Sequence, residues 1–344
     1  MNETTSLTFE DLQQLICEIF VKAGFSSRAA DSLATTIASG ERDACKSHGV
    51  YRVEGCLRTV SAGKVEPAAE PLLEDDGTGI IRVDAAHGFS SPAFDLGAPL
   101  LAARAKELGI AALVINRCTH FSALWPEVEA LTGMGVAALA MCPSYATVAP
   151  AGGSKPLLGT NPIAFGWPRP GENPYVFDFA TSVAARGEIE LYRQAGRKLP
   201  QGWAVDAQGN PTTDPTEALA GAMLPFGDHK GSAISTMVEL LAGTMIGDFT
   251  SAEALDYLGT TALAPQHGEL IVAFCPQRFS AGRRGDPFAR AEILFEAIAG
   301  QGARLPSQRR FTARKKSLSE GIILTKDEMA LLEHMRQNGL DAVQ

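Results

Sequence analysis

Two residues with obvious chemical potential, His48 and Arg52, stand four positions apart in the segment CKSHGVYR (residues 45–52) of this 344-residue chain. Side chains four residues apart on a helix project from the same face. A guanidinium binds a carboxylate through two parallel hydrogen bonds, and an imidazole can transfer a proton at a neighbouring atom. The pair therefore suits a substrate whose carboxylate is attached to the reacting carbon. The alternative interpretation is a surface His and Arg with no catalytic role.

Ser47 precedes His48 and has two interpretations of its own. Apolar side chains recur at helical spacing between residues 50 and 60, which predicts a helix that begins at Ser47 and ends before Gly63. Ser47 either caps this helix or orients His48 through its hydroxyl. Because a helix N-terminus disfavours positive charge, we expect the pKa of His48 to be lowered.

Two loops that combine glycine and lysine could bind an anion: GDHKG (227–231), directly before a patterned helix, and AGGSK (151–155). The alternative for the first loop is an ordinary helix start with an exposed lysine. A basic cluster between Arg304 and Lys316 could hold a phosphate, although a solvated charged stretch is the commoner meaning of such a run.

Several familiar chemistries lack support. The segment GMGVAA (133–138) has dinucleotide-fingerprint spacing, but it follows a helical pattern and enters a strand-like run, so it predicts a helix C-cap. The chain has no P-loop and no Gly-x-Ser-x-Gly nucleophile elbow. Its six cysteines include no Cys-x-x-Cys pair, and no His-Glu-x-x-His occurs, so we predict no metal site.

The secondary-structure elements that must position these residues show two kinds of sequence pattern. Helical periodicity dominates the first 60 residues. One helix is expected from the capping residue Thr8 to Gly24, and a second is expected to begin after the Ser26–Ser27 pair and to end near Gly40. Short apolar runs at 79–83, 110–115, 136–141 and 175–180 predict strands, and they alternate with helices in the middle of the chain. Further helices are expected at 231–244 and after Thr325. The fold class is therefore mixed α/β, with an α+β character.

The composition of the chain limits the kinds of partner that the protein can bind. A formal net charge of −9 argues against a nucleic-acid partner, because such binding depends on a basic surface. No run of apolar residues approaches the length of a membrane span, and the N-terminus has no basic and apolar leader. We therefore expect a cytoplasmic protein with no membrane partner.

Five short motifs, in this order, carry a family resemblance: SHGVYR (47–52), HFS (120–122), GTNP (159–162), FDFATS (177–182) and GWAVD (202–206). Together they resemble the malate/L-lactate dehydrogenase-type oxidoreductases over nearly the whole chain. The resemblance implies NAD(P)H-dependent reduction of 2-oxo acids or cyclic imines, a non-Rossmann fold with a largely antiparallel central sheet and a helical N-terminal domain, and a homodimer. The expected domains are 1–110, 111–300 and a tail, 301–344, that returns to the first.

Lys46 departs from the family pattern, which commonly has Asp directly before Ser/Thr-His-Gly. A lysine there resembles the ketimine-reductase branch, which reduces Δ1-piperideine-2-carboxylate to L-pipecolate and Δ1-pyrroline-2-carboxylate to L-proline. An imine nitrogen is more basic than a ketone oxygen, so loss of the acidic partner of the histidine is tolerable.

The same resemblance implies roles for individual residues. His48 is the expected proton donor, Ser47 orients it, and Arg52 and Thr160 hold the substrate carboxylate. The implied cofactor contacts are His120, Phe121, Ser122, Ala123, Leu124, Asp178, Phe179, Ala180, His229, Lys230, Arg304, Arg309 and Arg310. Where the family often has Pro-Gly-Glu, this chain has PSQRR (306–310), and arginines there favour the 2′-phosphate of NADPH over NADH.

Two alternatives stay open. An NAD(P)-dependent 2-hydroxy-acid dehydrogenase would use the same His48 and Arg52. A cofactor-free lyase or isomerase would use His48 as acid and base and Arg52 as the carboxylate clamp. The turn-rich loop at 196–215 is a candidate lid over the substrate.

Overall fold

The computed structural model describes residues 4–344 and divides the chain into two compact units. The first contains the chain up to Ala140 together with Ala164–Phe177 and Ile271–Gln344. The second contains Met141–Ile163 and Asp178–Leu270. Each unit is made of segments that are distant in the sequence.

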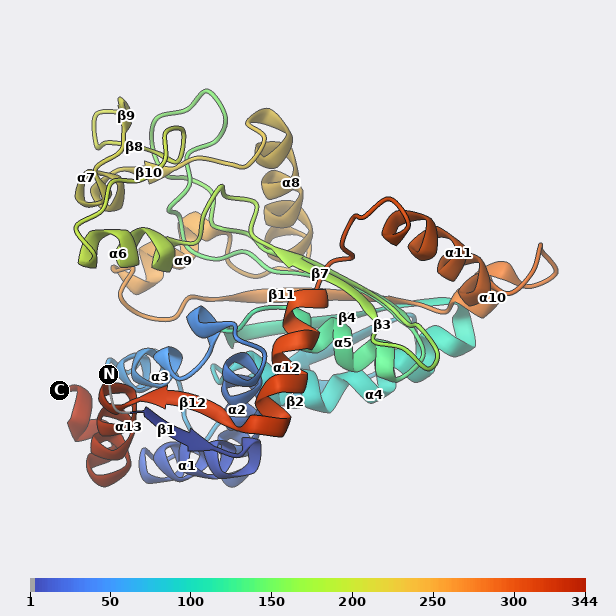
Figure 1. Cartoon of the computed structure of the whole chain (residues 1–344), viewed down its shortest axis with the longest axis horizontal. Coiled ribbons are helices and arrows are strands. Elements are labelled where there is room, and N and C mark those ends of the chain that lie inside the picture. Colours follow the sequence, from blue (N-terminus) through green and yellow to red (C-terminus); the bar gives the residue numbers. More distant parts are fainter. Residues whose placement is uncertain (1–3) are drawn as a thin grey trace. The chain divides into compact units, whose positions relative to one another are not determined.

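The N-terminal part of the first unit is helical, as predicted (Figure 1). Its elements are α1 (Phe9–Lys22), α2 (Ser27–Arg42), a short 3₁₀ helix η1 (Lys46–His48) and α3 (Tyr51–Ser61). The side chains of Thr8 and Ser26 cap α1 and α2 by accepting hydrogen bonds from Asp11 N and Ala29 N. The apolar stripes that predicted these helices are fully buried, including Leu12, Ile16, Ile19, Phe20, Leu33 and Ile37.

The C-terminal tail packs against this helical part. Strand β12 (Ile322–Thr325) pairs antiparallel with β1 (Thr4–Leu7), and α13 (Lys326–Asn338) follows it directly. Thr325 and Glu328 form a capping box at the start of α13. Figure 1 shows β12 and α13 beside β1 and α1.

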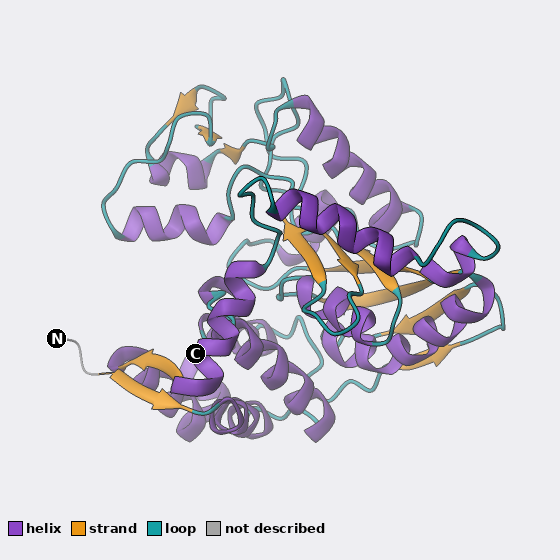
Figure 2. Ribbon diagram, turned by 45° about the vertical axis from the view of Figure 1, so that its right-hand side comes forward, coloured by secondary structure: helices purple, strands orange, loops and turns teal. Residues whose placement is uncertain are grey.

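A seven-stranded, mostly antiparallel sheet has the order β2-β3-β4-β11-β5-β6-β7. Strands are drawn in orange in Figure 2. Its strands are β2 (Leu72–Glu74), β3 (Ile80–Asp84), β4 (Ile110–Thr119), β11 (Gln266–Phe274), β5 (Ala137–Met141), β6 (Ile163–Trp167) and β7 (Tyr175–Phe179). The pair β3 and β4 is parallel, and α4 (Ser90–Leu108) forms the crossover between them. α5 (Trp125–Gly133) connects β4 to β5. The predicted mixed fold with a largely antiparallel sheet is confirmed.

The second unit is built around a smaller apolar core that includes Val148, Leu158, Ile189, Leu199 and Met223. Its elements are α6 (Arg186–Gln194), β8 (Ala204–Val205), β9 (Pro211–Thr212), α7 (Pro215–Ala220), β10 (Ala222–Met223), α8 (His229–Glu239), a π-helical segment η2 (Leu240–Thr244) and α9 (Ser251–Leu258). The helix predicted at 231–244 is therefore an α-helix that begins two residues earlier and ends in a π-helical turn.

The remaining elements of the first unit are α10 (Pro276–Ser280), α11 (Pro287–Ala299), α12 (Gln308–Glu320) and the 3₁₀ helix η3 (Gly339–Val343). As predicted, the glycines of GMGVAA end a helix: α5 stops at Gly133, and Gly135 has a positive φ of 81° before β5. Among residues 4–344, no helix is long and apolar enough to cross a membrane.

One helix boundary predicted near the candidate catalytic residues was wrong. The expected helix from Ser47 is two elements, because η1 covers Lys46–His48 and α3 begins only at Tyr51. Ser47 therefore does not cap α3. The backbone leaves α2 through Ala44, which has a positive φ of 56°, so the chain turns sharply before Ser47.

Candidate active site

Ser47 and His48 lie in the tight turn between α2 and α3, and their side chains are in contact. Ser47 Oγ is 3.0 Å from His48 Nδ1, so the hydroxyl holds the ring by one nitrogen. Of its two predicted roles, orienting His48 is the one that the structure allows. His48 Nε2 has no hydrogen-bond partner among residues 4–344 and is the ring nitrogen available to a substrate.

Arg52 lies in the first turn of α3 and is tied to the same turn. Its Nε donates a hydrogen bond of 2.7 Å to the carbonyl of Ser47. Within the described chain its two terminal nitrogens make no hydrogen bond or ion pair, and the guanidinium lies 5.7 Å from the Tyr51 ring centre. A guanidinium fixed through Nε with both terminal nitrogens available suits bidentate binding of a carboxylate. The structure thus brings Ser47, His48 and Arg52 together.

The electrostatics of this group keep His48 neutral. Burial of the ring within the fold, followed by the positive charge of Arg52 and an electrostatic contribution from His120, lowers the pKa of His48 to about 3. The predicted direction is therefore confirmed, but the cause is burial and charge rather than a helix N-terminus. At neutral pH the imidazole of the free protein carries no charge.

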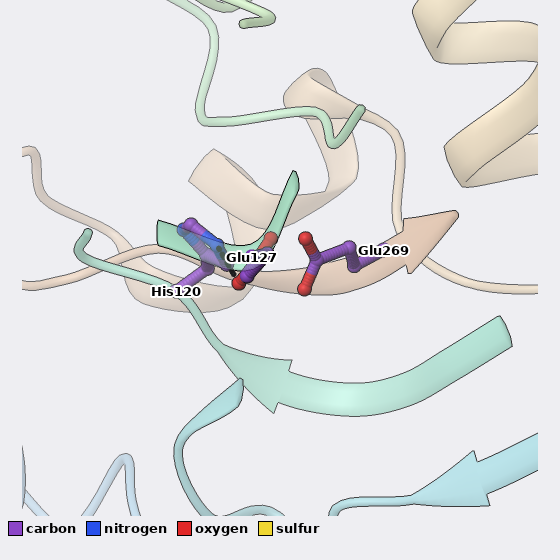
Figure 3. A group of neighbouring side chains, drawn as sticks. All are labelled: His120, Glu127 and Glu269. Carbon is purple, nitrogen blue, oxygen red and sulfur yellow. Dashed lines mark ion pairs between the residues drawn. The ribbon is translucent and has the colours of Figure 1, made fainter. Parts of the chain in front are cut away.

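The predicted cofactor segment 120–124 follows β4 directly. His120 is buried, and its Nε2 lies 3.6 Å from Oε1 of Glu127, a buried carboxylate on α5 (Figure 3). Phe121 packs edge-on against Phe89 at 5.6 Å, and Leu124 is fully buried at the start of α5. Glu269 on β11, the third residue drawn in Figure 3, is also fully buried.

Ser122 opens onto a cavity of about 370 Å³ between α2, α4 and α5. Phe94 and Trp125 line it together with the carboxylates of Asp31 and Asp95. Carboxylates repel a phosphate, so this cavity does not suit the phosphate groups of a dinucleotide.

In the second unit, Thr160 is held by a buried polar network below the GTNP turn. Asn161, at a positive φ of 36°, donates from Nδ2 to Glu239 Oε1 at 2.7 Å and to Ser235 Oγ at 2.9 Å. Ser251 donates to Asn161 Oδ1 from its hydroxyl and to Glu239 Oε2 from its backbone N–H, at 3.0 and 2.8 Å. Every polar atom of the Asn161 amide is thereby satisfied, which fixes the residue next to Thr160.

The same unit brings three predicted segments together. Thr181 donates from its backbone N–H to the carbonyl of Thr160 at 2.8 Å, and Phe226 N–H donates to the carbonyl of Thr181 at 3.0 Å. The Phe226 ring packs edge-on against Phe179 at 5.7 Å. The segment 178–180 therefore lies between the Thr160 turn and the loop that leads into α8.

That loop presents the residues predicted for the dinucleotide. Gly227 and Asp228 both have a positive φ of 56°, and His229 and Lys230 form the exposed first turn of α8. The N-terminus of an 11-residue helix beside an exposed lysine fits the negative charge of a pyrophosphate. These residues thus fit the group that the resemblance implies.

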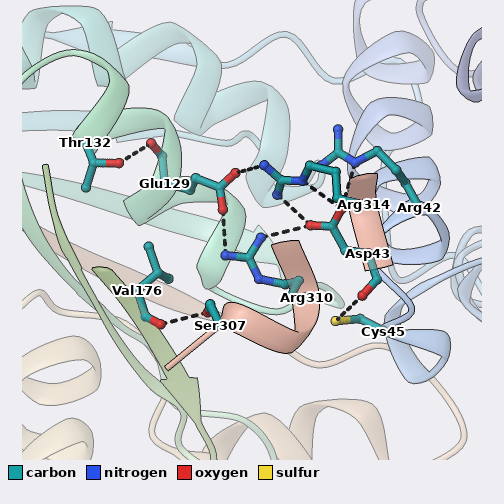
Figure 4. Close-up of polar contacts among 9 residues, drawn as sticks. All are labelled: Arg42, Asp43, Cys45, Glu129, Thr132, Val176, Ser307, Arg310 and Arg314. Atoms are coloured by element: carbon teal, nitrogen blue, oxygen red, sulfur yellow. Dashed lines mark hydrogen bonds and ion pairs between the residues drawn. The ribbon is translucent and has the colours of Figure 1, made fainter. Parts of the chain in front are cut away.

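The three arginines predicted for the adenosine end have different surroundings. Arg304 and Arg309 are exposed, whereas Arg310 is buried and its charge is already balanced. Its Nη1 is 2.8 Å from Asp43 Oδ2 and its Nη2 is 2.6 Å from Glu129 Oε2 (Figure 4). The guanidinium also stacks on the Trp125 ring at 3.9 Å.

Arg314, one turn along α12, completes this cluster. It binds Asp43 from Nε and Nη2 at 2.9 and 2.6 Å and also pairs with Glu129. Burial alone would raise the pKa of Asp43, but hydrogen bonds from Arg314 and Arg42 outweigh it and lower that pKa. The cluster of Asp43, Glu129, Arg310 and Arg314 holds α12 against α2 and α5.

Sequence reasoning missed Glu239 and Asp43, the buried carboxylates on which these arrangements depend, and Glu41, whose buried carboxylate accepts a hydrogen bond from the Val50 N–H at 2.9 Å. Each is a charged residue in or directly after a helical segment, where an exposed face is the usual expectation. Their partners lie as far as 271 residues away in the chain. A single sequence gives no signal for such pairs.

Comparison with known proteins shows the family. The family model described as malate/L-lactate dehydrogenase matches residues 7–333, and the chain belongs to this family. The predicted resemblance is confirmed. Proteins of this family are NAD(P)-dependent dehydrogenases and reductases.

Individual relatives are more specific. The chain is 70% identical over 344 residues, all of both chains, to a Δ1-pyrroline-2-carboxylate reductase of Agrobacterium fabrum. It is 54% identical to a Δ1-pyrroline-2-carboxylate/Δ1-piperideine-2-carboxylate reductase of Pseudomonas aeruginosa, covering 95% of this chain and 99% of the relative. Among solved structures, Δ1-piperideine-2-carboxylate reductase of Pseudomonas syringae pvar. tomato matches with a TM-score of 0.92 and 40% identity, over 96% of this chain and 99% of the other.

Proposed function

We propose that this protein is an imine reductase that uses NAD(P)H to convert Δ1-pyrroline-2-carboxylate to L-proline and Δ1-piperideine-2-carboxylate to L-pipecolate. The observation that carries the proposal is the full-length identity of 70% to a reductase of the first substrate. The turn with Ser47, His48 and Arg52 supports it, because it offers a carboxylate clamp and a proton carrier on one short segment.

The chain's own residues have three tasks in this reaction. Arg52 binds the substrate carboxylate through its two terminal nitrogens, and Thr160 contributes to the same recognition. Ser47 holds Nδ1 of His48, which leaves Nε2 for the imine nitrogen. The bound cofactor supplies a hydride to C2, so the C=N double bond becomes C–H and N–H once the nitrogen receives a proton.

Because the pKa of His48 is low in the free protein, the carboxylate of the bound substrate has a second effect besides binding to Arg52. A carboxylate bound at Arg52 offsets the positive charge that helps to lower the pKa of His48. Substrate binding therefore raises the pKa of His48 and allows the ring to hold the proton that the imine nitrogen takes. Proton transfer is thus coupled to recognition of the carboxylate.

For the cofactor, we propose NADPH rather than NADH. His120 to Leu124, Asp178 to Ala180, and His229 with Lys230 are the proposed dinucleotide contacts. Arg304 and Arg309 are exposed cations suited to a 2′-phosphate. We assign Arg310 to positioning α12, since its charge is balanced by Asp43 and Glu129.

The proposal also includes a homodimer, which the family resemblance implies, and a cytoplasmic location, which is inferred from the sequence. The domain division at residues 110 and 300 and the lid at 196–215 stay predictions.

The test is oxidation of NADPH, followed by absorbance, with each cyclic imine and with pyruvate and oxaloacetate. Parallel assays use NADH and the His48→Ala variant. Turnover of the imines with NADPH, weak ketone reduction and loss of activity in His48→Ala are expected. Preference for a 2-oxo acid would make the protein a 2-hydroxy-acid dehydrogenase, and failure to bind NADPH would favour a cofactor-free lyase or isomerase.

A further inference from the structure

The turn that carries Ser47 and His48 rests on a buried carboxylate that the proposed chemistry does not use. Glu41, in the last turn of α2, has a side chain that is only 1% exposed. Its Oε1 accepts a hydrogen bond of 2.9 Å from the backbone N–H of Val50, and its Oε2 forms an ion pair with Lys46. One carboxylate therefore holds the turn on both sides of His48.

Close packing shows how little freedom this turn has. A Cβ atom at Gly40 would collide with the carbonyl of His48, and one at Gly49 would collide with the Glu41 carboxylate. His48 N–H also donates to the carbonyl of Cys45 at 2.8 Å. A shift of Glu41 would consequently move the backbone of His48.

Lys46 connects the same turn to the C-terminal tail. Its ammonium donates to the carbonyl of Ile323 in β12 at 3.3 Å, and it lies 3.8 Å from Glu328 Oε1 at the start of α13. With Glu41, these are all the polar partners of the Lys46 ammonium among residues 4–344. The ammonium is thus directed to α2 and the tail, whereas the neighbouring Ser47 binds the His48 ring.

We infer that Lys46 is a positioning residue that acts with Glu41 to fix the turn carrying Ser47 and His48 and to tie it to β12 and α13, without exchanging a proton with the substrate. The inference rests on the proposed function for the role of His48. It accounts for a lysine at the position where the family commonly has an aspartate.

The first test compares kcat and KM for Lys46→Met, Lys46→Arg and Glu41→Gln with the wild type. Lys46→Met is expected to lower kcat on the order of tenfold, because small displacements of a reacting group have large effects on rate. Lys46→Arg is expected to stay within about twofold, since a guanidinium keeps the ion pair but cannot give up its proton. A proton-donating Lys46 would instead fail equally with Arg and Met, and that result would overturn the inference.

The double variant Glu41→Gln/Lys46→Met tests whether the two residues act as one unit. Its kcat is expected to be no lower than that of the worse single variant, because the Glu41–Lys46 ion pair that each single substitution breaks is lost only once. Multiplied losses would contradict the inference. Lys106→Met is the matched control, since Lys106 is exposed on α4 of the same unit, outside every proposed binding segment, and the kcat of this variant is expected to equal that of the wild type.

A pH profile separates positioning from general damage to the fold. Burial raises the pKa of Glu41, and the negative charge of nearby Glu328 raises it further. The Lys46 ammonium and the hydrogen bond from the Val50 N–H act in the opposite direction and lower this pKa. The charged residues that follow Glu41 in the chain, Arg42 and Asp43, form an ion pair with each other. Without Lys46 the carboxylate has no cation, so Glu41 takes up a proton more readily. The ratio of Lys46→Met to wild-type kcat is expected to rise as the pH falls, and this rise should vanish in the double variant.

A readout independent of turnover distinguishes this inference from the proposed function. In protein labelled with ¹³C-histidine, the NMR signal of the His48 ring, assigned with His48→Gln, is expected to shift or broaden in Lys46→Met and not in Lys106→Met. An unchanged His48 signal in Lys46→Met would overturn the positioning role, whatever substrate the enzyme uses. Absence of imine reduction by the wild type would overturn only the proposed function.

Discussion

The neutral state of His48 has a measurable consequence for stability. The pKa of His48 is about 3 in the folded protein and about 6.5 in an unfolded chain. Between these values the unfolded state binds a proton that the native state does not, so stability falls as the pH is lowered through 6.5. Integrated from pH 7 to pH 5, the loss from this one group is about 2 kcal/mol.

The matched perturbation is His48→Gln, which keeps a polar side chain of similar size and removes the titration. The assay is urea unfolding of both proteins at pH 7 and pH 5. The wild type is expected to lose about 2 kcal/mol more than the variant over this interval, since every other titrating group is common to both. Equal losses in the two proteins would refute the claim that His48 is buried in its neutral form.

Three further substitutions test the other parts of the site. Arg52→Lys keeps the charge but removes the planar pair of donors, so the KM for the imino acid should rise on the order of tenfold or more while the KM for NADPH stays constant; an unchanged substrate KM would contradict the clamp. Glu239→Gln leaves Asn161 with a weaker acceptor and should lower the free energy of unfolding by about 1–3 kcal/mol in urea; a fully stable variant would show that the network does not hold the Thr160 turn. Arg310→Met leaves buried carboxylates short of a cation and should cost about 3 kcal/mol in thermal unfolding, and loss of NADPH binding with unchanged stability would return Arg310 to the cofactor site.

The sequence predicts which residues of the His48 turn lie together better than it predicts the shape of the backbone there. The spacing of His48 and Arg52 suggested a proton carrier and a carboxylate clamp; these roles stay predictions, and the structure places both residues on one turn. The predicted helix across them was wrong because the backbone leaves the helical region at Gly49, where ψ is −146°, and the spacing of the apolar side chains does not show this break. Contacts from Glu41 stabilise the turn, and these are tertiary contacts that the local sequence does not predict.

The helices with clear apolar periodicity, α1 and α2, were predicted to within a few residues, since burial of one face determines them. The basic segment around Arg310 was not understood in the same way. A run of arginines indicated either a phosphate site or a solvated face, and the partner of Arg310 is Asp43, 267 residues earlier. Ion pairs between residues so far apart in the sequence can be recognised only once the fold is known.

The most direct test of the central claim follows the hydride itself. The enzyme is supplied with NADPH deuterated at the transferable C4 position and an equal mixture of Δ1-piperideine-2-carboxylate and pyruvate, and the products are analysed by mass spectrometry and NMR. An imine reductase will give L-pipecolate with one deuterium at C2 and little labelled lactate. Labelled lactate as the main product, or pipecolate without deuterium at C2, would contradict the account.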